Sequence, residues 1–449
     1  MLGTEYSWLI SISDPANGSP RVRLASTGLL TLAVGVFCLL CVSLRAASAP
    51  RELMREASAA ATAGDIAAVI AKLEAVRALR PDYPRVLNNL ARYYLQAGRS
   101  DDAVAQLREM AAMGLKADLA RDDTFAPLRN RADFAALARA FAANEAKAGH
   151  DETAWAITDM TGIIEGFAVH RAGLESFFSD VRNRCIWYRD VSGKTAVMKK
   201  FSTDADGLLG VFALKIDAGR HLLWASSSAV PEMTGYQTTD RSRAFLAAYA
   251  IDSRRLVRTY AVPPDDHEHV LGDFVVAADG TVYATDSASP VIWRLAPGGA
   301  ALEKWLETED FTSLQGIAFG PTGRDLYVSD YANGLWHIDL ASRTPRLLAA
   351  PPHTTLFGLD GIYSVPGGLV AVQNGINPQR VIRIAIGADG APSSVKILSA
   401  GNGEASDLGL GQVINGHFEF VGNSGWALFE SAKTPPPARP VTILRTSLE

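Results

Sequence analysis

The chain has 449 residues, of which 48% are hydrophobic and 20% charged, a balance typical of folded globular proteins. This length exceeds one ordinary hydrophobic core, so two or more domains are expected. The formal net charge is −5, from 43 basic and 48 acidic residues. Nucleic-acid binding needs a concentrated basic surface, so the composition argues against nucleic acid as a partner.

An apolar segment near the N-terminus predicts export or membrane anchoring. Residues 25–44 carry no charge, Arg21 and Arg23 precede them, and small residues continue to position 49. This is the order of a signal peptide, but the uncharged length also suffices for a transmembrane helix. In both alternatives residues 1–24 stay cytoplasmic and the rest is periplasmic or otherwise extracytoplasmic. Contact with a membrane is expected only through residues 25–49, and a buried core helix is disfavoured because no polar face is present.

Residues 50–149 are expected to form a helical domain. Ala, Leu, Arg and Glu dominate, and apolar residues recur every three or four positions between Gly or Pro breaks. The unit from Pro84 to Met113, with Tyr93-Tyr94-Leu95 and then Gly98 between two helices, resembles a tetratricopeptide repeat. That resemblance implies stacked helices, which either present a groove to a protein partner or serve as a structural cap.

Residues 153–449 show strand alternation with glycine turns, and one pattern recurs six times. The copies step by 45, 63, 42, 45 and 49 residues. They begin at Glu165, Gly210, Asp273, Gln315, Asp360 and Gly409. Repeats of this length and pattern predict propeller blades. The expected fold is therefore mainly β: a six-bladed β-propeller preceded by an α-helical tetratricopeptide-like segment and an N-terminal signal or anchor helix.

Two blade phrases carry a more specific resemblance. The runs Gln315–Asp330 and Leu359–Ile362 are similar to those of the gluconolactonase and senescence-marker-protein family of six-bladed propellers. The resemblance implies a divalent cation in the central channel, Ca²⁺ or similar, and hydrolysis of a small-molecule lactone or ester.

The family's site residues transfer only in part. Glu165-Gly166 and Asp360-Gly361 match its Glu-Gly and Asp-Gly pairs, whereas Gln315 stands at an expected asparagine and Gly272 precedes Asp273 where the family has Asn-Asp. The resemblance thus implies metal ligation by Glu165, Gln315 and Asp360, with Asp273 and Asp360 as catalytic residues. Physically, first residues of inner strands converge on the channel, and carboxylate and amide oxygens suit a hard cation.

Two classes of function follow. The first is a metal-dependent lactonase or esterase of the cell envelope, with Asp273 as the base. The second is a noncatalytic binding or scaffold protein that uses the helical repeats and the propeller surface. The altered residue Gln315 and the glycine at position 272 favour the second class, and the matching Glu165 and Asp360 favour the first.

A further acidic and histidine-rich run, Asp265–His269, has the composition of a metal site. Its spacing matches no recognised ligand pattern, so a solvated acidic loop is the favoured interpretation.

Overall fold

The computed structural model describes residues 48–170, 175–190, 197–403, 405–429 and 436–449. Nearly all of the predicted signal or anchor segment, through residue 47, lies outside the described residues. Within the described ranges, no helix is both long enough and apolar enough to cross a bilayer.

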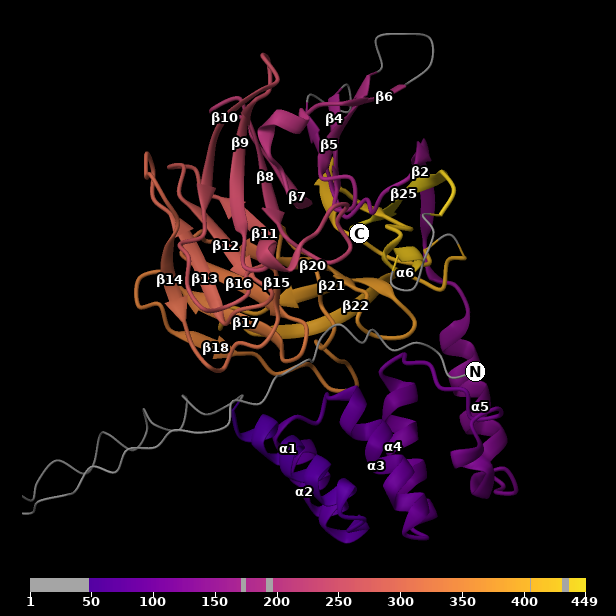
Figure 1. The fold of residues 1–449 in the computed structure, drawn as a ribbon. Helices are drawn as coiled ribbons and strands as arrows, with labels where there is room; N and C mark the ends of the chain where they lie inside the picture. The colour runs from indigo at the N-terminus through magenta and orange to yellow at the C-terminus, as the bar shows by residue number, and fades with distance from the viewer. Residues whose placement is uncertain (1–47, 171–174, 191–196, 404, 430–435) are drawn as a thin grey trace, which may run out of the picture. The chain divides into compact units, whose positions relative to one another are not determined.

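Helices come first in the described chain. They are α1 (Ser48–Thr62), α2 (Ile66–Leu79), α3 (Pro84–Gln96), α4 (Ser100–Ala112), the 3-10 helix η3 (Asp123–Leu128) and α5 (Phe134–Glu145). Each of α1 to α4 packs against the next α-helix in the chain (Figure 1). Gly98, between α3 and α4, has φ +74°, a left-handed conformation that glycine adopts at low cost and that reverses the chain.

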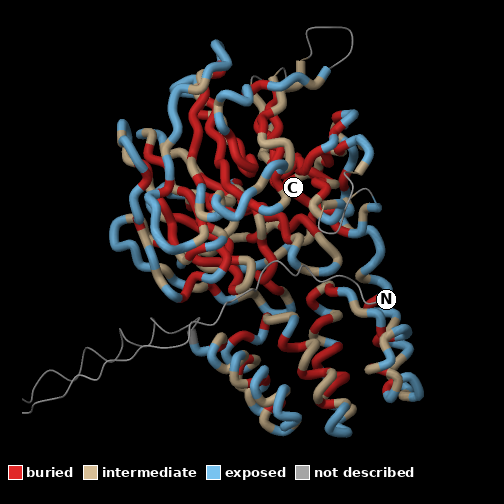
Figure 2. Tube along the Cα trace, viewed as in Figure 1, coloured by how far each residue is buried: buried red, intermediate tan, exposed pale blue. Residues whose placement is uncertain are grey.

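The helices bury a common apolar stripe. Leu87 and Leu90 of α3 and Leu107 of α4 are fully buried in one hydrophobic cluster. Leu87 and Leu90 are three residues apart in α3, and Leu107 follows the buried Val104 by three residues in α4, so each pair lies on one face of its helix, and these helices carry buried segments in Figure 2. The helical pattern predicted from the sequence is confirmed.

The rest of the described chain forms six antiparallel sheets, each a blade. Blade 1 holds β3 (Phe167–His170), β4 (Glu175–Asp180), β5 (Cys185–Asp190) and β6 (Val197–Lys200). Blade 2 holds β7 (Gly210–Asp217), β8 (Leu222–Ser228), β9 (Ala244–Ala250) and β10 (Arg255–Ala261). Blade 3 holds β11 (Leu271–Val276), β12 (Val282–Asp286), β13 (Val291–Leu295) and β14 (Glu303–Glu307). Blade 4 holds β15 (Leu314–Phe319), β16 (Asp325–Asp330), β17 (Gly334–Asp339) and β18 (Pro345–Leu347).

The last two blades also take strands from the segment that follows α5. Blade 5 holds β19 (Ile362–Val365), β20 (Gly368–Gln373), β21 (Arg380–Ile386), β22 (Pro392–Ala400) and β1 (Ala148–Gly149). Blade 6 holds β23 (Gly411–Ile414), β24 (His417–Val421), β25 (Arg439–Ser447) and β2 (Asp151–Met160). Short helices η4 (Asp204–Asp206), η5 (Thr238–Asp240) and α6 (Trp426–Phe429) lie in loops.

The blades close into a ring. The first strands β3, β7, β11, β15, β19 and β23 contact one another in this order, and β23 contacts β3. Blade 6 is completed by β2, which pairs antiparallel with β25, so main-chain hydrogen bonds join the start of the propeller to its end. This closure leaves no open gap between the first and last blades. The predicted mainly β, six-bladed fold is confirmed, and the six repeat starts begin six different inner strands.

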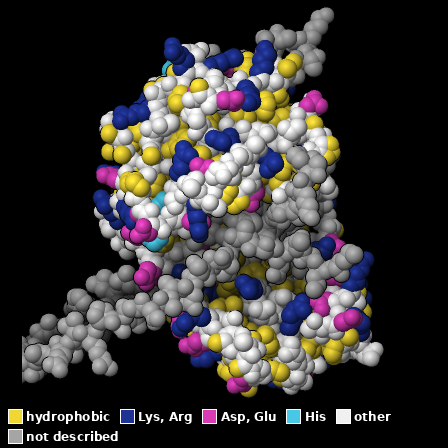
Figure 3. Space-filling model, in the orientation of Figure 1, with side chains coloured by type: hydrophobic (Ala, Val, Ile, Leu, Met, Phe, Trp, Pro, Cys, Tyr) yellow, Lys and Arg dark blue, Asp and Glu magenta, His cyan; other side chains and the backbone are white. Residues whose placement is uncertain are grey.

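Charged side chains are scattered over the visible surface without separating by sign. On the face drawn in Figure 3, Lys and Arg are interspersed with Asp and Glu. This distribution agrees with the small net charge of −5.

Candidate functional site

Four acidic residues gather where inner strands begin. Glu165 lies two residues before β3, Asp273 lies within β11, Asp360 lies two residues before β19, and Asp407 precedes β23. The exposed fractions of Glu165, Asp273 and Asp407 are only 8%, 1% and 8%. We call these four side chains the channel carboxylates. Ring closure brings them together because each blade places the start of its inner strand at the same end of the channel.

Burial makes the charged forms of Glu165 and Asp360 unfavourable. Burial, followed by the charge of Asp360, raises the pKa of Glu165 well above its ordinary value, although the Trp426 indole N–H donates to its Oε2. Burial raises the pKa of Asp360 to about 6, and the charges of Asp273 and Asp407 add to this rise. The neighbouring carboxylates therefore disfavour ionisation of Glu165 and Asp360, so these two groups favour a proton or a cation.

Lys215 of β7 is the cation nearest to Asp273. Its Nζ lies 2.8 Å from Asp273 Oδ1 and 5.1 Å from the ring centre of Tyr363. Burial raises the pKa of Asp273, and Lys215 opposes that rise. Neither the composition nor the repeat pattern had indicated this ion pair.

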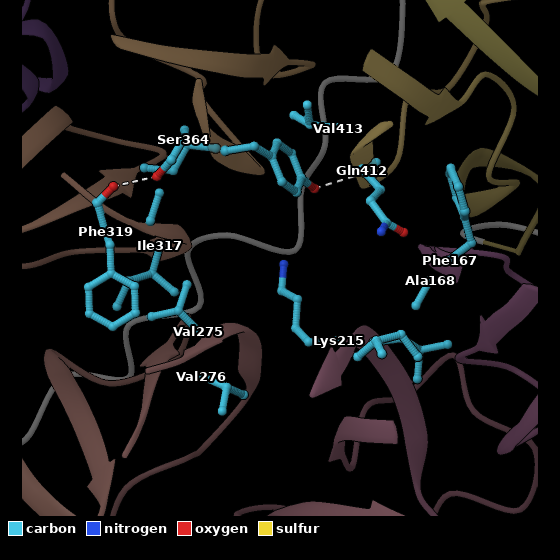
Figure 4. A pocket seen from close by; sticks show the side chains of 16 residues that line it. Phe167, Ala168, Lys215, Val275, Val276, Ile317, Phe319, Ser364, Gln412 and Val413 are labelled. Carbon is cyan, nitrogen blue, oxygen red and sulfur yellow. Dashed lines mark hydrogen bonds between the residues drawn. The ribbon is translucent and has the colours of Figure 1, made fainter. Parts of the chain in front are cut away.

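A cavity of about 340 Å³ lies further along the same six inner strands. Its walls are largely apolar and include Phe167, Val275 and Ile317, while Lys215 projects into it (Figure 4). The ion pair therefore links the cavity to one of the channel carboxylates.

Asn374 is a site residue that the sequence analysis missed. Its Nδ2 donates to Asp360 Oδ2 at 2.7 Å and to the Leu408 carbonyl at 2.8 Å. Its Oδ1 is buried without a hydrogen-bond partner, as is Asp273 Oδ2. A buried polar atom without a partner costs free energy, so these two oxygens are suited to a further ligand. The only local signal is the polar pair Asn374-Gly375 at the end of β20.

Gln315 has a different environment from the other predicted ligands. Its Nε2 donates to Ser313 Oγ at 3.0 Å, and its Oε1 accepts from Ser287 Oγ at 3.2 Å. Both ends of its amide are thus occupied within the protein. Glutamine is longer than asparagine, and its amide reaches these two serines. Glu165 and Asp360, in contrast, lie close enough for their charges to interact.

The Asp265–His269 loop differs from its favoured interpretation at one residue. Asp266 and His267 are exposed, as a solvated loop requires, but His269 is only 1% exposed. Its ring nitrogens contact Asp286 Oδ2 at 2.7 Å and Asp265 Oδ1 at 2.9 Å. Two carboxylate partners replace the solvation that burial removes, so this histidine anchors the loop.

Other buried acidic groups serve the fold. A tryptophan of a third strand donates its indole N–H to an aspartate at the end of the second strand in three blades. These pairs are Trp187–Asp180 at 2.9 Å, Trp293–Asp286 at 3.0 Å and Trp336–Asp330 at 3.4 Å. Asp286 and Asp330 also accept backbone N–H groups, so we assign these aspartates to loop anchoring rather than to the site.

The side-chain atoms of the channel carboxylates that could coordinate a metal ion are oxygens. In the ranges that the structure describes, no three His, Cys, Asp or Glu side chains are arranged to hold a metal ion. A cation at the channel carboxylates would therefore need amide or water oxygens as well. The unpartnered Oδ1 of Asn374 is such an atom, and oxygen donors of this kind suit hard cations.

Comparison with known proteins covers the two parts separately. A tetratricopeptide repeat family profile matches residues 60–120. No curated protein matches the chain.

Several solved propellers are similar in fold. A PQQ-bound aldose sugar dehydrogenase from Streptomyces coelicolor is 14% identical, with a TM-score of 0.46, covering 67% of this chain and 99% of that one. Virginiamycin B lyase from Staphylococcus aureus is 12% identical, with a TM-score of 0.44, covering 67% and 99%. A luciferin-regenerating enzyme is also 12% identical, with a TM-score of 0.44, covering 67% and 95%. These likenesses concern the fold and assign no activity. The chain thus joins a tetratricopeptide-like helical segment to a six-bladed β-propeller.

Proposed function

We propose that the propeller is a metal-dependent hydrolase of a lactone or ester. The observation that carries the proposal is the cluster of channel carboxylates, of which three are buried and Asp360 is half-buried, together with the unpartnered oxygens Asp273 Oδ2 and Asn374 Oδ1. Burial and, after it, repulsion by neighbouring carboxylates raise the pKa values of Glu165 and Asp360, and a divalent cation would relieve that repulsion.

The chain's own residues take distinct roles in this proposal. Glu165 and Asp360 hold the cation, and Asn374 takes the place that the resemblance had implied for Gln315. When bound, Ca²⁺ or a similar ion supplies polarisation of a carbonyl oxygen. Asp360 would also be a catalytic residue, because a group that binds beside the cation would lie next to its carboxylate.

Asp273 acts as the base. Its Oδ2 has no partner and can accept a proton, while its Oδ1 stays paired with Lys215. The burial that raises the pKa of Asp273 makes it a stronger base than an exposed aspartate.

The cavity suggests the type of substrate. Its walls include Phe167, Val275, Ile317 and Phe319, and Lys215 and Gln412 are among its few polar side chains (Figure 4). A cavity of about 340 Å³ with such walls favours a small lactone or ester with a hydrocarbon substituent over a bare sugar lactone.

Extracytoplasmic localisation remains part of the proposal. Export through residues 25–49 would expose the site to an environment where weak Ca²⁺ sites are useful. Two C-terminal fusions at residue 449 would test the localisation: one to a phosphatase that is active only outside the cytoplasm, and one to a reporter that is active only inside it.

A noncatalytic binding role is the second candidate. A cavity of about 440 Å³ is lined by Ile66, Ile70, Glu74 and Arg99, among other residues of the helical segment. Apolar walls with one acid and one base are compatible with a bound peptide from a protein partner.

Metal content and hydrolysis test the first candidate together. The full chain, purified in detergent, is analysed for metals and then assayed on aliphatic and sugar lactones and on esters, with and without EDTA. We expect about one cation per chain, hydrolysis that EDTA abolishes, and loss of both in Asp360→Ala. Asp204→Ala is the matched control, since the Asp204 side chain is 95% exposed. A metal-free wild type without hydrolysis on any substrate would leave the binding role.

A further inference from the structure

One loop belongs both to the candidate site and to the contact with the helical segment. The β20–β21 loop (residues 374–379) begins with Asn374, which donates to Asp360. Three residues later, the Asn377 carbonyl accepts the backbone N–H of Lys116 at 2.7 Å. Ile376 packs against the hydrophobic core of the helices. The loop that supplies Asn374 is therefore held from outside the propeller.

Arg380 ties the end of this loop to the end of α4. It is only 2% exposed, and its Nη1 donates to the Met113 carbonyl at 2.9 Å. Its Nε donates to Gln373 Oε1 at 2.7 Å, so one guanidinium joins the helical segment to the residue before Asn374. Gly114 allows this approach, because a Cβ there would lie 2.9 Å from Arg380 Nη1.

Blade 5 departs from the other blades at this position. In blades 1, 3 and 4 the second strand ends in an aspartate that accepts hydrogen bonds from backbone N–H groups. In blade 5 it ends in Gln373, which donates to the carbonyls of Thr355 and Phe357 and leaves its Oε1 for Arg380. Glutamine in place of aspartate thus gives blade 5 an oxygen acceptor at the end of β20 for the Arg380 guanidinium at the start of β21.

Phe357 carries a second contact with the helices. Its ring stacks on Tyr83 with the centres 4.1 Å apart, and the Arg80 guanidinium lies 4.4 Å from the same ring centre. Arg80 also donates to the Asn333 carbonyl at 2.7 Å. Gln373 connects the Phe357 contact with the Arg380 contact. Its Nε2 donates to the Phe357 carbonyl, and its Oε1 accepts from Arg380.

We propose that the helical segment positions the candidate site: the Lys116 N–H and Arg380 hold the β20–β21 loop so that Asn374 stays against Asp360. They are positioning groups, and neither contacts a reacting atom. The effect on the cation depends on the proposed function, whereas the effect on the loop does not. The sequence neighbourhood of the loop shows no such role, because residues 116 and 377 are far apart in the chain.

A proline at position 116 isolates one bond. Lys116→Pro removes the N–H that Asn377 accepts, and Lys116→Ala is the matched control that removes the same side chain and its ion pair with Glu145 but keeps the N–H. In the full chain, we expect Lys116→Pro to weaken Ca²⁺ binding in calorimetry about tenfold, a typical effect of losing outer support of a ligand. Amide hydrogen exchange of residues 374–377 and 379 should accelerate in the same variant, and Lys116→Ala should match the wild type in both measurements.

The outcomes separate the two proposals. Equal affinity and equal exchange in the proline and alanine variants would overturn the positioning role. If the wild type binds no Ca²⁺, the proposed function fails, and the exchange comparison alone decides the positioning role. Should Lys116→Pro unfold, Arg380→Lys serves instead. It keeps the charge but loses the planar guanidinium that joins Gln373 to Met113, and we expect the same faster exchange.

Discussion

The Lys215 ammonium group lies 2.8 Å from Asp273 Oδ1 and joins the inner strands of blades 2 and 3. The Asp273 side chain is 1% exposed, so its charge depends on this partner. Lys215→Met leaves this carboxylate buried and unpaired. We expect the free energy of unfolding at pH 7 to fall by about 3 kcal/mol, the lower end for breaking a buried pair.

The pH dependence of that loss identifies its cause. Without Lys215, the folded-state pKa of Asp273 rises further, so the folded form binds a proton more tightly than the unfolded chain. The loss should therefore shrink between pH 7 and pH 5 in urea unfolding experiments. Lys215→Arg keeps the charge and should lose much less. Equal, pH-independent losses in both variants would mean that packing, rather than charge, stabilises this position.

The ionised Asp360 side chain should lower the free energy of unfolding when no metal is bound. Its pKa is raised from 3.8 to about 6, chiefly by burial. A carboxyl group with a raised folded-state pKa destabilises the fold progressively as pH rises from the unfolded-state pKa through the folded-state pKa. Asp360→Asn should therefore be more stable than wild type in EDTA at pH 7, by up to about 3 kcal/mol at 1.4 kcal/mol per pKa unit.

Calcium should reverse that order. Binding only the folded state stabilises it, so excess Ca²⁺ should raise the Tm of the wild type and leave that of Asp360→Asn unchanged. Asp204→Asn, at an exposed position, should behave as wild type in both buffers. An Asp360→Asn Tm that rises with Ca²⁺ as much as the wild-type Tm would remove Asp360 from the ligand set.

We expect substitution of Asn374 and of Gln315 to affect Ca²⁺ affinity differently. Asn374→Ala removes an unpartnered buried oxygen beside Asp360 and should weaken Ca²⁺ binding at least tenfold. Gln315→Ala removes an amide already bonded to Ser313 and Ser287, so the affinity should stay within about threefold. Calorimetry on the two variants measures both. The reverse result would restore the ligand set that the family resemblance implied.

His269 should make the stability of the fold depend on pH. Burial lowers its pKa, but the bonds to Asp286 and Asp265 outweigh burial and raise the pKa above its ordinary value. A raised folded-state pKa stabilises the fold fully below the unfolded-state pKa, and this contribution is lost as pH rises through the folded-state pKa. We therefore expect the wild-type free energy of unfolding to decline as pH rises above the ordinary pKa of histidine.

His269→Gln is the matching variant. Glutamine can donate one hydrogen bond to a carboxylate but carries no titrating charge, so the decline should disappear. His337→Gln is the control, since His337 also contacts a carboxylate, Asp325, at 2.8 Å. Urea unfolding of the three proteins between pH 5.5 and 8.5 measures the difference. A decline that persists in His269→Gln would assign it to another group.

Local sequence patterns were enough to predict much of the fold. The spacing of Leu87 and Leu90, and that of Val104 and Leu107, indicates helices because it depends only on neighbours along the chain. The six repeats likewise predict six inner strands, and Glu165 and Asp360 stand at their starts. These are properties of position within a repeat, and they need no knowledge of distant residues.

The missed site residues depend on contacts across the ring. Trp426 bonds Glu165 from 261 residues away, and Lys215 pairs with Asp273 between two blades. The side-chain direction of Gln315 toward its serines also follows from local packing that a motif does not express. The repeat pattern describes the residues of one blade and carries no information about contacts with a neighbouring blade. No periodicity therefore identifies such residues.

The sequence by itself determined the order of helices and strands, the number of blades and the carboxylates at the inner-strand starts, because periodicity and turn residues act over a few positions. Only the tertiary structure decided that Asn374 meets Asp360, that Lys215 links the cavity to Asp273, and that Arg380 connects α4 to the site loop. The physical reason is packing within blades, between neighbouring blades and between propeller and helices. It brings together residues that lie from 14 to 267 positions apart in the chain, and burial then gives their charges and unpartnered oxygens their chemical effect.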